Sequence, residues 1–144
     1  MQSHIQGAPV FAHIHVDLDP GETVIAESDA MSSMAADLDM AAKFHGGFFS
    51  GLFKRFFGGE SLFVNHFTNN TNGPRRVTLV QANPGNIRQV NIDNASLCLQ
   101  PGAFVAATPG IKLKAKWAGI RSWFSGEGLF KLLATGAGTL WYGA

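Results

Sequence analysis

The residue types that carry most enzyme chemistry are few in this chain, and their spacing does not form a catalytic site. Glu60 and Glu127 each follow a glycine at matching places, where a carboxylate is better suited to accept turn N–H groups than to act as a catalytic acid or base. His13 and His15 share one strand face and could bind a metal only with a third ligand. Cys98, the single cysteine, lies in the apolar run 97–99 and is predicted to be a buried, unreactive thiol. We predict no catalytic residues and no metal site.

The common motifs of active sites and cofactor sites are also absent. The chain has no Gly-x-Ser-x-Gly elbow, no Gly-x-x-x-x-Gly-Lys loop, no His-Glu-x-x-His and no Cys-x-x-Cys. Residues 136–138 begin like a dinucleotide-binding loop, but Trp141 stands in place of the third glycine. We therefore expect neither an enzyme nor a cofactor, and a small-ligand-binding protein would need a polar pocket that the sequence does not indicate.

Lys112, Lys114 and Lys116 alternate with apolar residues, so they project from one strand face at intervals of about 6.6 Å. This is close to the phosphate spacing of an extended nucleic-acid strand, which makes the three lysines a candidate nucleic-acid-binding site. No aromatic side chain alternates with them on that face to stack on bases. We favour the alternative, a solvated face whose lysines protect a sheet edge. Three arginines could add contacts to nucleic acid: Arg75, Arg76 and Arg88.

The stretch 46–59 is the most distinctive surface element that the sequence predicts. At about 100° per residue, its large apolar side chains fall on one half of a helical wheel, opposite Lys54 and Arg55. Glycine pairs at both ends limit this amphipathic helix to about three turns. The apolar residues are Phe48, Phe49, Leu52, Phe53, Phe56 and Phe57.

This helix could bind a membrane surface or pack against protein. Because it is only about 15 Å long and has two cations, it is too short to hold a membrane alone, and we favour packing within the protein or an oligomer. A reduced version of the same pattern, Ile120, Trp123 and Phe124 beside Arg121, occurs later in the chain. We expect one or two short amphipathic helices.

The sequence around these candidate residues contains two similar copies of one pattern. Residues 18–24 recur as 99–105, Lys43-Phe44 recurs as Lys116-Trp117, and 59–63 recur as 126–130. The order is kept while the offset decreases, as expected for one unit whose second copy has shorter loops. We predict a single domain over 1–144, built from an internal repeat at about 10–80 and 90–144.

Each copy reads as strands joined by tight turns. Val10, Ala12, Ile14, Val16 and Leu18 alternate with polar residues, the period of a half-buried strand. A Pro-Gly pair then suits a type II turn in both copies. Later strands are predicted to turn these residues inward: Leu38, Met40, Ala42 and Phe44 in the first copy, and Ile111, Leu113, Ala115 and Trp117 in the second. The expected fold is all-β, with the two units fused into one continuous sandwich or barrel.

Composition and charge limit the class of protein and its expected location in the cell. The chain is 46% hydrophobic and 15% charged, which excludes a disordered protein. Residues 1–60 carry eight carboxylates and three cations, whereas 61–144 carry eight cations and two carboxylates, an asymmetry that suits a head-to-tail contact. The N-terminus lacks the basic region of a signal peptide, and no apolar run reaches the ~20 residues of a spanning helix. We expect a cytoplasmic protein, peripheral to a membrane if 46–59 docks there.

Several of these motifs resemble a known family. Residues 18–22, Ala30-Met31, 58–63, 101–104 and 126–130 resemble a bacterial family, without assigned activity, that is related to a eukaryotic mitochondrial biogenesis protein. The resemblance places the chain in the tryptophan RNA-binding attenuator protein-like (TRAP-like) superfamily and implies a double-stranded β-helix and symmetric homo-oligomers. It implies no catalytic residues. Because family members continue beyond the equivalent of Ala144, it also implies that a C-terminal portion is missing.

Two functions remain in competition. The leading one is a non-enzymatic, homo-oligomeric β-scaffold that docks on a membrane surface or protein partner through the Phe-rich stretch. The alternative is RNA binding through Lys112, Lys114 and Lys116, although superfamily membership alone does not carry RNA binding over to this chain.

Overall fold

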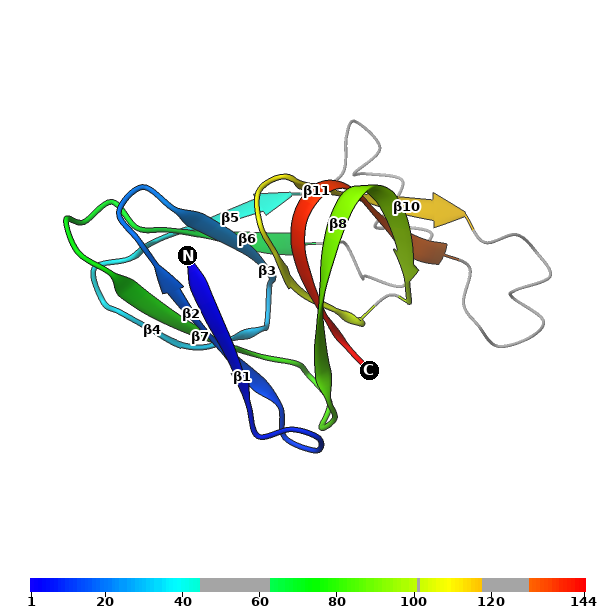
Figure 1. Ribbon diagram of the computed structural model, residues 1–144, viewed down its shortest axis with the longest axis horizontal. Helices are drawn as coiled ribbons and strands as arrows, with labels where there is room; N and C mark the ends of the chain where they lie inside the picture. The colour runs from blue at the N-terminus through cyan, green and yellow to red at the C-terminus, as the bar shows by residue number, and fades with distance from the viewer. Residues whose placement is uncertain (45–62, 101, 118–129) are drawn as a thin grey trace.

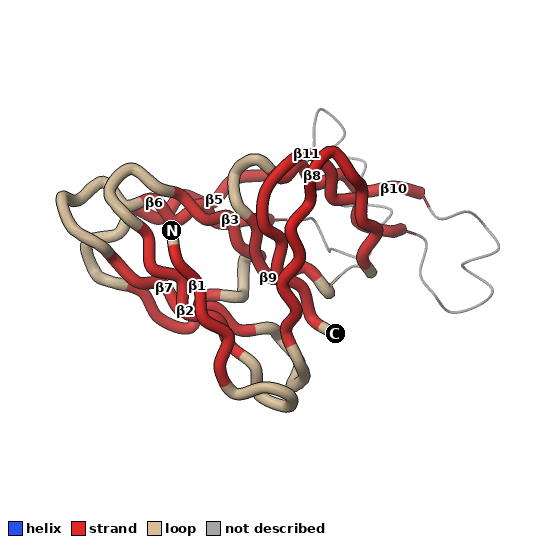
Figure 2. The backbone as a smooth tube through the Cα atoms, in the orientation of Figure 1, coloured by secondary structure: helices blue, strands red, loops and turns tan. Residues whose placement is uncertain are grey.

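The computed structural model describes residues 1–44, 63–100, 102–117 and 130–144, and every regular element in these ranges is a β-strand. The strands form two antiparallel sheets, which confirms the predicted all-β class (Figure 2). Both stretches predicted as helices, 46–59 and 120–124, lie outside the described residues. The double-stranded β-helix and the TRAP-like assignment stay predictions.

The first sheet has the strand order β1 (Gln2–Gln6), β2 (His13–Leu18), β7 (Arg75–Val80) and β4 (Met31–Met34). It occupies the lower left of the molecule in Figure 1. β2 and β7 pair along their whole length, from His13 opposite Val80 to Leu18 opposite Arg75. These two strands therefore form the centre of the sheet, with β1 and β4 at its edges.

The second sheet runs in the order β10 (Ile111–Trp117), β11 (Phe130–Gly143), β9 (Phe104–Ala107), β3 (Thr23–Glu27), β6 (Phe63–Thr68) and β5 (Asp39–Phe44). A further strand, β8 (Ile87–Leu99), pairs with β11. β11 changes its other partner along its length, from β10 in its first half to β9 in its second. Figure 1 shows β8, β10 and β11 to the right of the first sheet.

A glycine-rich bend in β11 allows this change of partner. Gly136 and Gly138 have φ values of +102° and +149°, and the pairing with β8 shifts register between Gly136 and Ala137. A Cβ atom on Gly136 would lie 2.3 Å from the carbonyl oxygen of Gly110. A side chain therefore does not fit at this bend, where the sheet begins to curl.

The two sheets pack face to face around a shared hydrophobic core. The alternation predicted for β2 is confirmed, since Ala12, Ile14, Val16 and Leu18 are all buried. Val10 is 53% exposed and precedes the strand, so the prediction was wrong at its start. The second sheet contributes Val24, Ala26, Phe67, Val105, Ala106, Ile87 and Trp141 to this core.

The curl of the second sheet encloses a second core. β3 and β9 have buried residues on both faces, because the first sheet covers one face and the curled strands cover the other. This second core comprises Ile25, Val64, Ile92, Leu99, Phe104, Ala107, Ile111, Leu113, Leu132, Ala134 and Leu140. Residues 24–26 of β3 and 104–107 of β9 are therefore buried on both sides of the sheet.

Segments 19–22 and 100–103, which match in the predicted repeat, close with the same backbone hydrogen bond. Gly21 and Gly102 have φ values of +84° and +85°. The Glu22 N–H donates to the Asp19 carbonyl at 3.0 Å, and the Ala103 N–H donates to the Gln100 carbonyl at 3.1 Å. In both places the glycine takes the positive φ that the predicted type II turn requires of it.

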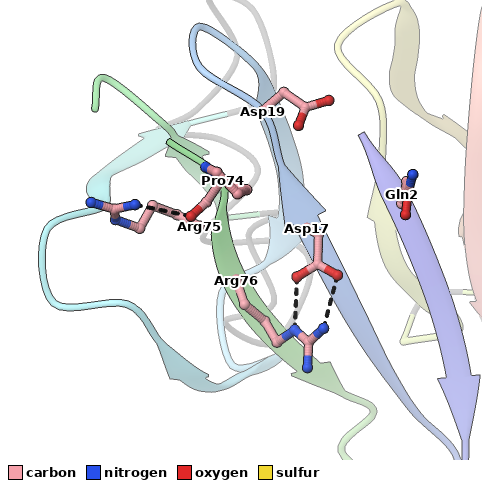
Figure 3. Close-up of a pocket in the computed structure, with 6 residues that line it drawn as sticks. All are labelled: Gln2, Asp17, Asp19, Pro74, Arg75 and Arg76. Carbon is pink, nitrogen blue, oxygen red and sulfur yellow. Dashed lines mark hydrogen bonds and ion pairs between the residues drawn. The ribbon is translucent and has the colours of Figure 1, made fainter. Parts of the chain in front are cut away.

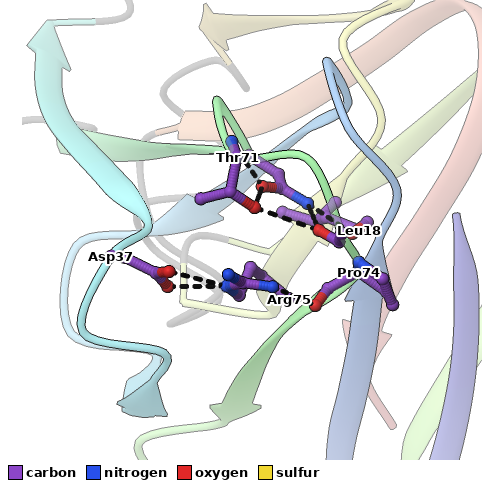
Figure 4. Close-up of polar contacts among 7 residues, drawn as sticks. Leu18, Asp37, Thr71, Pro74 and Arg75 are labelled. Carbon is purple, nitrogen blue, oxygen red and sulfur yellow. Dashed lines mark hydrogen bonds and ion pairs between the residues drawn. The ribbon is translucent and has the colours of Figure 1, made fainter.

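A buried asparagine fixes the connection between β6 and β7. The Asn69 side-chain amide donates to the carbonyls of Leu18 and Gly73, both at 2.8 Å, and its oxygen accepts the Thr71 N–H at 3.0 Å (Figure 4). This turn therefore ties the end of β2 to the start of β7. The segment 69–73 thus serves the fold as a turn.

The inward residues predicted for β5 are wrong in part. Leu38 is buried, but it precedes the strand, and Met40 and Ala42 are exposed. β5 is the last strand of its sheet, and no described element packs over either of its faces at residues 39–43. In β10, Ile111 and Leu113 are buried as predicted, but Ala115 is exposed. The side chains of Phe44 and Trp117 lie outside the described residues.

Candidate functional site

The three predicted lysines lie together on an exposed sheet face. Lys112, Lys114 and Lys116 are all exposed on β10, whose opposite face buries Ile111 and Leu113. The alternation places the three amino groups on one side of the strand, as the sequence predicts. Their position is therefore confirmed, while their role stays a prediction.

The pairing with β11 adds a fourth lysine that sequence reasoning missed. Lys116 lies directly opposite Lys131, and directly opposed residues of an antiparallel pair project from the same face. Lys131 is also exposed. The two cations are far apart in the sequence, so only the strand register reveals that they are neighbours.

β8 extends this face by a third strand. Cys98 lies opposite Leu133, which in turn lies opposite Lys114. Cys98 is exposed, so the prediction of a buried thiol was wrong: strand alternation turns Leu97 and Leu99 inward and the cysteine outward. We call the whole set the lysine face: Lys112, Lys114, Lys116, Lys131, Leu133, Thr135, Ser96 and Cys98.

The lysine face is open because the first sheet covers only part of β11. The face of β11 that carries Lys131 also carries Trp141, at the other end of the strand. Trp141 is buried in the core shared with the first sheet, where its indole N–H donates to Gln89 at 3.0 Å. The first sheet therefore covers the Trp141 end of β11, whereas Lys131, at the other end, is exposed.

The charge of the lysine face is uncompensated in the described residues. β10 and β11 contain no Asp or Glu, and the four lysines make no ion pair with another described residue. The single carboxylate of β8, Asp93, lies opposite Ala137 beyond the register shift and accepts a hydrogen bond from Asn94. The face therefore presents four positive charges to solvent.

Two of the three arginines that could add contacts to nucleic acid form ion pairs with carboxylates of the protein. Arg76 donates to both carboxylate oxygens of Asp17 at 2.7 and 2.8 Å, and the Arg75 Nε lies 2.7 and 2.8 Å from the two oxygens of Asp37. The hydrogen bond from each arginine lowers the pKa of its carboxyl partner. Both arginines belong to β7 of the first sheet, so only Arg88, exposed on β8, lies on a strand of the lysine face.

A polar depression also lies over the first sheet. It has a volume of about 470 Å³ and is lined by Gln2, Asp17, Asp19, Pro74, Arg75 and Arg76 (Figure 3). Two carboxylates and two guanidinium groups balance its charge, and Figure 3 shows Arg76 turned toward Asp17. The depression therefore offers no uncompensated charge to attract a small ionic ligand.

The histidines of β2 form no metal-binding cluster with other described residues. The rings of His13 and His15 are 5.0 Å apart, and pairing with β1 places His4 opposite His15. His15 Nδ1 lies 3.0 Å from the Thr78 hydroxyl, and burial lowers the pKa of His15. Within the described ranges, no three His, Cys, Asp or Glu side chains are placed to hold a metal ion.

Two other candidate sets lie outside the described residues. These are the Phe-rich stretch 46–59, with its two cations, and the glutamates Glu60 and Glu127. The described ranges also contain no helix long and apolar enough to cross a membrane.

A known protein structure and a known family are both similar to this chain. A crystal structure of a protein from Streptococcus pyogenes is similar to this chain, with a TM-score of 0.75 and 26% sequence identity over 99% of the chain. The chain spans 64% of that protein's length. No curated protein matches significantly. The family described as Mitochondrial biogenesis AIM24 matches residues 3–144. The chain therefore belongs to the Mitochondrial biogenesis AIM24 family.

Proposed function

We propose that this chain is a non-enzymatic scaffold that attaches to an anionic membrane surface through the lysine face. The observation that supports this proposal is the set of four exposed lysines on one sheet face with no described carboxylate beside them. An extended positive surface of this kind suits a partner that is itself an extended negative surface.

The other residues of the face favour lipid over nucleic acid. Leu133 on β11 and Cys98 on the neighbouring strand β8 lie beside the lysines and provide apolar contact. No aromatic side chain occurs among the described residues of the face, so it lacks the stacking platform that single-strand binders use. Lysine stems can also cover apolar surface while the amino groups reach lipid phosphates.

The expected strength of this attachment is modest. Each lysine near an anionic membrane contributes about 1 kcal/mol, so four lysines supply roughly 4 kcal/mol at low salt. That corresponds to about a thousandfold enrichment at the surface, which salt weakens. Firm attachment needs a second element, and the Phe-rich stretch 46–59 is the predicted apolar contribution.

Vesicle co-sedimentation tests the proposal. The protein should sediment with phosphatidylglycerol-containing vesicles at low salt and not with pure phosphatidylcholine vesicles. Replacing Lys112, Lys114 and Lys116 together with alanine should weaken binding by roughly a hundredfold. Arg88→Ala is the matched control, because it removes an exposed cation of β8 outside the lysine face. If this control weakens binding as much as Lys114→Ala does, the lysine face is not the docking surface.

Two further measurements separate apolar from electrostatic attachment, and membrane binding from RNA binding. Combining Phe53→Asp with Phe56→Asp should reduce binding that survives high salt, since apolar contact is not screened. RNA binding measured over a salt series distinguishes the alternative. If the protein binds RNA and not vesicles, and the triple lysine variant flattens the salt slope, nucleic-acid binding replaces the membrane proposal.

A further inference from the structure

The outer edge of β5 lacks the features that usually protect the edge of a sheet from pairing with another strand. β5 pairs with β6 on one side, and no described strand pairs with its other side. Residues 39–43 are exposed on both faces, and Met40 is 48% exposed. A regular edge strand with unpaired backbone groups and no proline or register shift is a template for pairing with another strand.

The sequence of β5 is complementary to itself when two copies run antiparallel. With Ala41 on a two-fold axis, Asp39 of each copy lies opposite Lys43 of the other, and Met40 lies opposite Ala42. Both charge pairs are therefore attractive, and a large apolar side chain meets a small one. We infer that the free edge of β5 joins the same edge of a second copy, which makes a two-fold dimer with a sheet continuous across both chains.

A described contact positions one of these charges. The Asn70 side-chain amide donates to the Asp39 carboxylate, which holds this carboxylate at the start of the strand. The Asp39 carboxylate can accept further hydrogen bonds, so a lysine from the second copy can share it. Asp39 also makes no ion pair with another described residue.

The other end of the same sheet shows why the inferred dimer uses β5. If β10 paired with itself around Lys114, Lys112 would lie opposite Lys116 of the second copy, and the two Lys114 side chains would face each other. Every charged pair in that arrangement would be repulsive. The inference concerns the sheet end away from the lysine face, so it stands independently of membrane binding.

Charge exchange between two variants tests the dimer. In Asp39→Lys, both cross-strand pairs become positive against positive, and in Lys43→Asp both become negative against negative. Sedimentation velocity should show each variant with its dimer dissociation constant raised roughly tenfold to hundredfold. A mixture of the two variants should form a heterodimer about as tight as the wild-type dimer, because all its cross-strand pairs are attractive again.

A second substitution keeps the test decisive if a charge variant folds poorly. Ala41→Lys places two like charges at the axis and should also dissociate the dimer, whereas Ala41→Ser should not. Arg88→Ala, which removes an exposed cation of β8 that is remote from β5 in the strand order, is the control and should leave the dimer unchanged. A monomeric wild type at high concentration would overturn the inference, as would a mixture of charge variants that associates no better than its components.

Discussion

β5 and β10 are the two end strands of the same sheet, and they occupy matching places in the predicted repeat, where Lys43-Phe44 corresponds to Lys116-Trp117. Their exposed surfaces nevertheless differ. β10 buries Ile111 and Leu113 on one face and presents lysines at every second position on the other. β5 is exposed on both faces at residues 39–43 and carries one charge of each sign. The comparison teaches that the two end strands of one sheet can carry opposite charge patterns: the lysines of β10 would repel a second copy of β10, whereas the charges of β5 are complementary to a second copy of β5.

The largest expected difference between the two strands is in how much protein stability is lost when an apolar side chain of each strand is truncated to alanine. Leu113→Ala should lower the free energy of unfolding by about 2–5 kcal/mol, because it leaves a cavity in the second core. Met40→Ala should cost less than about 1 kcal/mol, because the side chain is already half exposed. Urea unfolding at dilute protein concentration measures both. Equal losses at the two positions would show that β5 is covered in solution and would break the comparison.

A smaller effect is expected on self-association when the lysines of β10 are removed. Replacing Lys112, Lys114 and Lys116 with threonine removes the repulsion along β10 and should produce new, concentration-dependent association. Light scattering after size exclusion measures this, with wild type as the reference. The alanine version used for vesicle binding should therefore be studied at low concentration. If the threonine variant associates no more than wild type, the lysines do not protect this edge.

The acid response should separate the first sheet from the lysine face. The hydrogen bonds from Arg76 and Arg75 hold the pKa values of Asp17 and Asp37 below their unfolded-state values. The resulting stabilisation is complete above the unfolded pKa, near 4, and is lost as the pH falls through each folded pKa. Urea unfolding should therefore show a smaller acid-induced loss in Asp17→Asn with Asp37→Asn than in wild type. The triple lysine variant should keep the wild-type acid dependence, since its lysines pair with no described carboxylate.

The features predicted correctly from the sequence are local ones. Alternation in β2 and at Lys112 to Lys116 follows from strand geometry, and the two Pro-Gly turns follow from the backbone freedom of Gly21 and Gly102. Each of these signals is contained in a few consecutive residues. The fold class and the position of the three lysines could therefore be predicted without a structure.

The features that were missed depend on register or on covering layers. Lys131 joins the lysine face only because β11 places it opposite Lys116. Cys98 sits in an apolar run that resembles a buried strand, but its own face of β8 is uncovered. Met40 alternates like a core residue, yet no described element packs over it. A single sequence contains the strand period but not which side of an edge strand receives a second layer.

The smallest expected effect uses Cys98 as a reporter within the lysine face. Because this thiol is exposed opposite Leu133, the native protein should react with a maleimide at a rate within about tenfold of the urea-unfolded chain. Anionic vesicles should slow the reaction several-fold, and phosphatidylcholine vesicles should not. Asp39→Lys, which changes β5 at the far end of the sheet, should leave the unliganded rate unchanged. Vesicles that bind the protein without protecting Cys98 would assign attachment to another surface, and β10 would then differ from β5 only as an edge that repels its own copies.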